Sequence, residues 1–199
     1  MFKIKTIGHS NYDIEYFVNM LKENNIDTIA DIRSTPYSRF NPQFNKDELN
    51  YVLKKQGLTY VFLGKELGAR YEDKSLLFLD GKVDFKKVQT TKSFLSGIER
   101  LISGLKKGYK ISLMCSEKNP IECHRFGLVS EYLSKNGFDV SHITPSGEIS
   151  QSNLELELME KYKLGGLFAN SEDYLDKAYL LLNKDIAYNA KTKLGDDEW

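Results

Sequence analysis

Hydrophobic and polar positions follow a repeating order along most of the chain: an amphipathic helix, a polar or glycine-containing break, and a short apolar strand. Apolar side chains recur at helical spacing in four segments: 12–24, 46–56, 92–107 and 125–136. Nearly continuous apolar runs predict five strands: 3–7, 26–33, 58–63, 109–114 and 138–143. Apolar strands that alternate with helices indicate a parallel sheet covered on both faces. We therefore expect a Rossmann-like α/β fold with a mostly parallel five-stranded sheet and helices on both faces.

Two segments depart from this order and decide the domain organisation. Residues 64–91 are long and polar for a simple connection, so we expect them to form a surface insertion. Residues 151–199 contain an expected helix at 172–189 and an acidic end. A chain of 199 residues fits one domain. We predict a single α/β domain over 1–150, with the segment 151–199 as a C-terminal helical extension packed on it.

The composition narrows the class of protein. It is 41% hydrophobic and 28% charged, which is typical of a soluble globular chain. Basic and acidic residues number 28 each, so a global basic field for scanning nucleic acid is absent, although a local patch stays open. No apolar run approaches the roughly 20 residues of a membrane span, and the N-terminus lacks the pattern of a signal peptide. We expect a folded cytoplasmic protein with no membrane partner.

The side chains that carry chemistry follow the expected strands. Ligands of open parallel sheets bind beyond the carboxyl ends of the strands. All three histidines, both cysteines and four of the five arginines lie there or at the borders of these loops. Arg33 and Arg39, with Ser34 and Ser38, form a pattern that suits a phosphate or carboxylate. The alternative is that Arg33 pairs with Asp31 or with a carboxylate of the C-terminal tail.

Helix position and charge suggest further roles. His124 and Arg125 are expected to open a helix, where free N–H groups and the helix dipole favour an anion, although a histidine there can also cap or pack. Asp31 and Glu117 lie at the ends of two strands and can act as acid, base or nucleophile, or can neutralise the arginines. The candidate substrate-binding residues are His9, Arg33, Ser38, Arg39 and Arg125.

The two cysteines permit several interpretations. Seven residues separate Cys115 from Cys123, and His124 follows directly, whereas structural zinc sites usually show two close pairs. We therefore assign no metal ligand, and the cofactor stays unknown. Cys115 is expected to be a small buried residue at a strand end, and the alternative is a nucleophile with a lowered pKa. Cys123 is expected to be the more exposed of the two. The candidate catalytic residues are Asp31, Glu117, Cys123 and His124.

Other nucleotide and phosphate chemistries are disfavoured by the sequence. A cysteine-phosphatase loop needs an arginine six residues after its cysteine, and position 121 is isoleucine. The phosphate-binding pattern GxxxxGK[ST] and the dinucleotide-binding pattern GxGxxG are both missing.

Several motifs together resemble the domain of unknown function 488 family. They are TIGHSN at 6–11, DIRSTPYSR at 31–39, LG at 67–68, GKVDF at 81–85, MCSEKNPIECHR at 114–125 and VSHI at 140–143. The match runs in order from residue 6 to about 158. The resemblance implies a compact α/β domain but no reaction. It implies a signature site made of His9, Asp31, Arg33, Pro36, Ser38, Arg39, Cys115, Glu117, Cys123, His124 and Arg125.

The leading hypothesis is an enzyme of hydrolase or group-transfer type acting on an anionic, phosphate-bearing substrate such as a nucleotide or nucleic acid. One alternative is a nucleic-acid-binding accessory module without catalysis. Another is a thiol or metal site with a sensing role, built on Cys115, Cys123 and His124. A protein partner also stays open.

Overall fold

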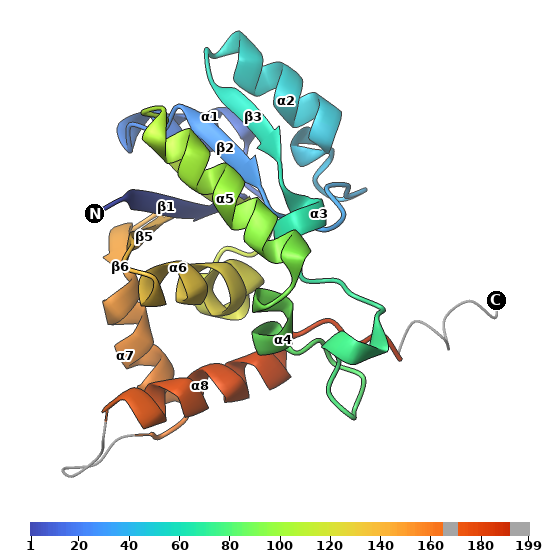
Figure 1. The fold of residues 1–199 in the computed structure, drawn as a ribbon. Coiled ribbons are helices and arrows are strands. Elements are labelled where there is room, and N and C mark those ends of the chain that lie inside the picture. The colour runs from blue at the N-terminus through green and yellow to red at the C-terminus, as the bar shows by residue number, and fades with distance from the viewer. Residues whose placement is uncertain (165–170, 192–199) are drawn as a thin grey trace.

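The protein is described here by a computed structural model that covers residues 1–164 and 171–191. Six strands form one sheet in the order β3-β2-β4-β1-β5-β6. Their bounds are β1 Lys3–Gly8, β2 Thr28–Asp31, β3 Thr59–Phe62, β4 Ile111–Cys115, β5 Asp139–Thr144 and β6 Gly147–Ser150. β6 pairs with β5 in antiparallel fashion, and the other pairs are parallel. The predicted α/β class and mostly parallel sheet are confirmed (Figure 1).

Helices cover both faces of the sheet, each with its apolar stripe turned inward. α1 (Ile14–Glu23) and α2 (Lys46–Lys55) pack on one face, and α5 (Lys92–Lys106) and α6 (Glu131–Lys135) on the other. The fully buried side chains of these helices include Phe17, Leu21, Leu49, Leu53, Phe94 and Leu133. Burying one such side chain contributes about 1.5–3 kcal/mol, so the two cores hold the sheet from both sides.

The sheet has one strand more than the five that we predict. β6 forms a hairpin with β5, in which Thr144 lies opposite Gly147. Gly147 has a φ of 118°, a backbone conformation that favours glycine. The four residues of β6 are exposed or half-buried, so the strand lacks the apolar run that marks the other strands. The hydrophobic pattern of the sequence therefore does not predict β6.

The segment 64–91 takes part in the core as well as in the surface. It contains three short helices: α3 Gly64–Leu67, the 3-10 helix η2 Lys74–Leu76 and α4 Phe85–Gln89. Val83, Phe85 and Val88 are buried in the same core as α5. Asp84 is the N-cap of α4, and its side chain accepts hydrogen bonds from the backbone N–H groups of the first turn. The segment expected as a surface insertion thus also fills space beneath the sheet.

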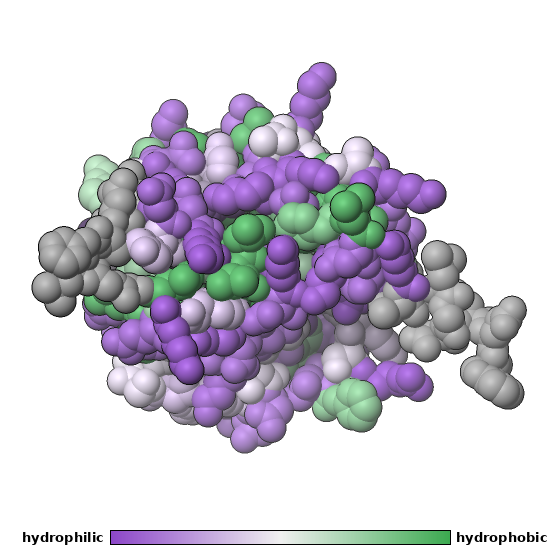
Figure 2. Space-filling model, turned by 90° about the horizontal axis from the view of Figure 1, so that it is seen from below, coloured by the Kyte–Doolittle hydropathy of each residue, from purple (hydrophilic) through white to green (hydrophobic). Residues whose placement is uncertain are grey.

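The C-terminal extension consists of α7 (Gln151–Lys161) and α8 (Ser171–Ile186), the second of which is the helix predicted at 172–189. Both pack with the π-helix η4 (Arg125–Ser130) in a small apolar cluster that includes Phe126, Leu154, Leu158, Tyr179 and Leu182. Seen from below, apolar residues form a limited band among hydrophilic ones (Figure 2). Within the described residues, no helix is both long enough and apolar enough to cross a membrane.

The topology opens a crevice at the carboxyl end of the sheet. β2 and β4 are neighbours in the sheet, with Asp31 in register with Met114. The chain leaves β2 toward α2 on one face, and leaves β4 toward η4, whose Leu128 and Val129 pack on the other. Neighbouring strands whose connections diverge in this way leave a space between the loops that follow them, where ligands of open sheets bind.

Candidate functional site

A pocket of about 240 Å³ occupies this crevice, and we call it the β2–β4 pocket. The loop after β2 contributes Ser34 and Thr35, and the loop after β4 contributes Ser116 and Glu117. The other lining residues are Arg33, Ala69, Arg70, Cys115, Glu122, Cys123, His124, Ile186 and Tyr188. Three of the four predicted catalytic residues, Glu117, Cys123 and His124, therefore share one pocket.

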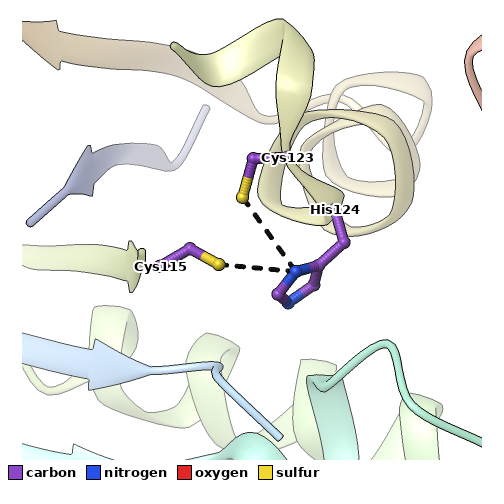
Figure 3. A group of neighbouring side chains, drawn as sticks. All are labelled: Cys115, Cys123 and His124. Carbon is purple, nitrogen blue, oxygen red and sulfur yellow. Dashed lines mark hydrogen bonds between the residues drawn. The ribbon is translucent and has the colours of Figure 1, made fainter. Parts of the chain in front are cut away.

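Cys115, Cys123 and His124 lie together at the base of this pocket, and we call them the Cys/His cluster (Figure 3). Cys115 is the last residue of β4, and Cys123 follows the 3-10 helix η3 (Pro120–Glu122) that turns the chain back toward the sheet. The Nδ1 atom of His124 lies 3.4 Å from Cys115 Sγ and 4.0 Å from Cys123 Sγ. Both cysteines are free and buried, so the expectation that Cys123 is the more exposed is wrong: it is 2% exposed and Cys115 3%.

Backbone groups fix the orientation of the cluster. His124 Nε2 lies 3.1 Å from the carbonyl oxygen of Ile32, which accepts a hydrogen bond, so Nε2 carries a hydrogen and Nδ1 faces the two sulphurs. The backbone N–H of Arg125 donates to Cys123 Sγ over 3.4 Å at the start of η4. Glu117 Oε2 accepts from Cys115 Sγ at 3.2 Å. Four polar side chains thus converge within a few ångströms.

The surroundings of the Cys/His cluster shift the pKa values of its three side chains. Burial raises the pKa of the Cys115 thiol well above its usual range. Burial acts on Cys123 in the same direction, but the neighbouring Cys115 thiol and the Arg125 charge hold the pKa of Cys123 well below its usual range. Burial would lower the pKa of His124, yet its hydrogen bond to Cys123 and the charge on that sulphur raise it. The two shifts act together: they favour a thiolate on Cys123 and a proton on His124.

Glu117 differs from an ordinary surface carboxylate. Burial of its carboxyl group, followed by the negative charge of Cys123, raises the pKa of Glu117. A glutamic acid that keeps its proton to higher pH than an exposed carboxyl group is better suited to donate that proton and later recover it. Glu117 is thus the carboxyl group of the pocket that is suited to proton transfer.

Arg33 and Asp31 form a buried pair. Arg33 Nε and Nη2 donate to the two carboxylate oxygens of Asp31 over 2.9 and 2.7 Å, and Nη2 also donates to the carbonyl of Phe44 at 2.8 Å. Tyr60 donates its hydroxyl hydrogen to Asp31 Oδ2 at 2.7 Å. Arg33 borders the pocket, but its planar fork is engaged by Asp31, which is the alternative that the sequence left open.

His9 belongs to the same buried network. Its Nε2 lies 3.0 Å from Arg33 Nη1, and its ring stacks on Phe44, the last residue of the 3-10 helix η1 (Pro42–Phe44), with 4.3 Å between ring centroids. Burial, aided by the Arg33 charge, lowers the pKa of His9 to about 4. His9 is therefore neutral at pH 7 and supports the loop after β2 from within.

Arg125 is also turned inward. It is fully buried, and its guanidinium donates to the carbonyl oxygens of Glu117 at 2.5 Å and Lys118 at 3.0 Å. Gly8 lies against the same loop: a Cβ there would come within 1.8 Å of the Glu117 carbonyl oxygen. Arg125 and Gly8 together hold the loop that carries Glu117, which explains the glycine in the motif TIGHSN.

Ser38 and Arg39 lie outside the lining of the pocket. Ser38 Oγ accepts hydrogen bonds from the backbone N–H groups of Phe40 and Asn41, and so shapes its own loop, whereas Arg39 is exposed. Arg70 follows the third strand, but it is not among the site residues that the sequence predicts. In the structure it borders the pocket, with its guanidinium over the Tyr188 ring at 5.6 Å.

The fold and the site define an α/β protein with a polar pocket at the carboxyl end of a parallel sheet, containing two cysteines, a histidine and a glutamate. The chain belongs to the family described as "Domain of unknown function DUF488", which matches residues 13–133. The suspected family is therefore confirmed, and the matched region contains the whole Cys/His cluster. Neither the curated proteins nor the solved structures that were searched gave a match.

Proposed function

We propose that the chain is an enzyme of hydrolase or group-transfer type that acts on a small, phosphate-bearing anion in the β2–β4 pocket. The observation that carries the proposal is that Arg70 and Glu117 line the same pocket. Arg70 supplies a positive charge for binding, and Glu117 supplies a proton for chemistry. A cation beside a carboxyl group with a raised pKa is an arrangement suited to transfer reactions of anions.

Arg70 is the exposed one of the two arginines that line the pocket. It is exposed, and its planar group lies over the Tyr188 ring, whereas the guanidinium of Arg33 is held by Asp31. The backbone N–H of Arg70 donates to Ser34 Oγ over 3.1 Å, which fixes the start of its side chain at the edge of the pocket. An arginine can hold two phosphate oxygens at once, and neighbouring hydroxyls can donate to a third.

The size of the pocket limits the substrate. Pockets that enclose a whole drug-sized ligand measure about 300–1,000 Å³. At about 240 Å³, the β2–β4 pocket suits a phosphate with its attached sugar ring, which is the part of a nucleoside monophosphate or of a nucleic acid end that would enter it, while the base would remain at the mouth. A hollow of about 320 Å³ lies under α5, but none of its described lining residues is a cysteine, a histidine or a carboxylate. Two larger hollows, of about 430 and 730 Å³, have carboxylates in their described lining but no cysteine or histidine. We therefore choose the β2–β4 pocket for the chemistry of its side chains and not for its size.

Binding is tested by calorimetric titration of the full chain with inorganic phosphate, nucleoside mono- and diphosphates and short single-stranded oligonucleotides. A hydrogen bond to a charged group contributes about 1.5–3 kcal/mol, so Arg70→Ala should weaken binding by about 10- to 150-fold. Arg100→Ala is the matched control, because Arg100 is also solvent-accessible but pairs with Glu66 outside the pocket. Equal affinities of the two variants would contradict the role of Arg70.

Catalysis is tested with the ligand that binds best, by following its conversion with phosphorus NMR. Glu117→Gln keeps the shape of the side chain but removes its proton transfer, so turnover should fall by about 10²–10⁴-fold while affinity changes little. A variant that turns the ligand over as fast as the wild type would contradict the proposed role of Glu117. Binding without any conversion would favour the accessory-module alternative.

A further inference from the structure

The Cys/His cluster has the composition of a transition-metal site. The ligating atoms of Cys115, Cys123 and His124 all lie within 4.8 Å of one another, although seven residues separate the two cysteines in the sequence. The fold closes this distance because β4 ends at Cys115 and η3 turns the chain back, so that Cys123 stands beside the strand end. Two sulphurs and one imidazole nitrogen favour a borderline-soft divalent ion such as zinc over magnesium or calcium.

The distances in the cluster fit tetrahedral coordination. Zinc lies about 2.3 Å from cysteine sulphur and about 2.05 Å from histidine nitrogen, so a tetrahedral ion holds sulphur and nitrogen about 3.6 Å apart. His124 Nδ1 lies 3.4 Å from one sulphur and 4.0 Å from the other, on either side of that value. The two sulphurs lie within 4.8 Å of each other, against about 3.8 Å in a tetrahedral zinc site, so side-chain movements of up to about 1 Å would form the site without a change of fold.

The surroundings hold the ligands as metal sites require. A histidine that binds a metal usually donates its other ring N–H to a carbonyl or carboxylate, which fixes its tautomer. His124 Nε2 does this with the carbonyl of Ile32, and Nδ1 is left facing the sulphurs. The N–H of Arg125 donates to Cys123 Sγ, which stabilises negative charge on that sulphur. Both neighbours are backbone groups, so the orientation does not depend on flexible side chains.

The fourth position of a tetrahedral ion would face the pocket. Glu117 Oε2 lies 3.2 Å from Cys115 Sγ, and Cys115, Cys123, His124 and Glu117 all line the β2–β4 pocket. Structural zinc sites have four protein ligands, whereas catalytic sites have three and leave one position for water or substrate. Three ligands beside an open pocket match the second arrangement.

We infer that Cys115, Cys123 and His124 bind one zinc-type divalent ion whose fourth coordination position opens into the β2–β4 pocket beside Glu117. Both cysteines bind the ion as thiolates and His124 binds it through an unprotonated Nδ1, so the cluster releases its remaining protons when the ion binds, and the two thiolate charges balance the charge of the ion. The ion would add a second positive centre for an anionic substrate opposite Arg70. This inference concerns the protein without substrate and does not depend on the proposed reaction.

The test is the metal content of the full chain, purified in reducing buffer after removal of any affinity tag and measured by elemental mass spectrometry. The wild type should contain about one zinc per chain. Cys115→Ser, Cys123→Ser and His124→Gln should each lower the zinc content at least tenfold. Glu122→Gln, a change at an exposed carboxylate of the same pocket, should leave it unchanged.

A second measurement keeps the inference falsifiable if a variant fails to fold. Wild-type protein is stripped with a chelator, checked by circular dichroism, and titrated with cobalt(II), which should give the intense visible bands of tetrahedral cobalt and a thiolate charge-transfer band. Folded wild-type protein that takes up neither zinc nor cobalt would overturn the inference. A disulfide between Cys115 and Cys123 in protein purified in reducing buffer would overturn it as well. Because no substrate is present, failure here is distinguishable from failure of the proposed function.

Discussion

His142 makes the stability of the fold depend on pH in a way that can be calculated. Its ring is fully buried on β5, where Nε2 donates to Gln151 Oε1 at 2.7 Å and Nδ1 accepts from the Thr6 hydroxyl at 2.8 Å. Both ring nitrogens are therefore satisfied in the neutral form. Burial, aided by the Arg125 charge, lowers the pKa of His142 from 6.5 to about 4.

The sign and the size of the effect follow from this pKa. Between pH 6.5 and 4 the unfolded chain binds a proton at His142 and the folded chain does not, so the free energy of unfolding falls as the pH falls. Above pH 6.5 both forms are neutral, and the effect disappears. Each pH unit inside the window costs about 1.4 kcal/mol, so lowering the pH from 7 to 5 should remove about 2 kcal/mol through His142 alone.

Urea unfolding of the wild type and of His142→Gln at pH 7, 6 and 5 measures this contribution. The variant is expected to be less stable at pH 7, because its hydrogen bonds to Thr6 and Gln151 are altered. The difference in unfolding free energy between the two proteins should then shrink by about 2 kcal/mol from pH 7 to pH 5. A difference that stays constant over this range would refute the assignment of a neutral, buried His142.

Two further substitutions test the packing that supports the site. Gly8→Ala places a Cβ 1.8 Å from the Glu117 carbonyl oxygen and should lower the free energy of unfolding by about 1–3 kcal/mol. Gly104→Ala in α5, whose Cβ meets the flexible end of Ile111, should change it less, and equal losses would contradict the close approach at Gly8. Arg125→Met leaves the buried carbonyls of Glu117 and Lys118 without their donor and should destabilise the protein by about 1–3 kcal/mol per carbonyl, partly offset by removal of a buried charge. A variant as stable as the wild type that loses anion affinity would instead show that Arg125 binds substrate.

Much of the fold can be predicted from the sequence because its strands and helices have different hydrophobic periods. α1, α2 and α5 begin and end within about two residues of the predicted segments. β6 is not predicted, because a short, half-exposed strand shows no hydrophobic period in the sequence. The burial of Val83 and Phe85 is not predicted, because both residues lie in a polar stretch of sequence and reach the core only through the folding of the chain.

The sequence predicts where in the fold the site lies, but it does not predict how the side chains of the site are oriented. The rule that ligands bind beyond the carboxyl ends of parallel strands selects Cys115, Glu117 and His124 correctly as neighbours. The sequence does not show which way an arginine points: Arg33 turns to a carboxylate two residues away, and Arg125 turns to backbone carbonyls. Tyr188 comes to the pocket from the C-terminal extension, and nothing near it in the sequence indicates a site.

We propose the β2–β4 pocket as the place where this protein binds its ligand. An NMR titration of isotopically labelled protein with inorganic phosphate and a nucleoside monophosphate tests it most directly, because each backbone amide reports separately. We expect the largest shifts on Ser34, Thr35, Arg70, Ser116 and Glu117. Shifts that gather instead around the hollow under α5, or no shifts at saturating ligand, would contradict it.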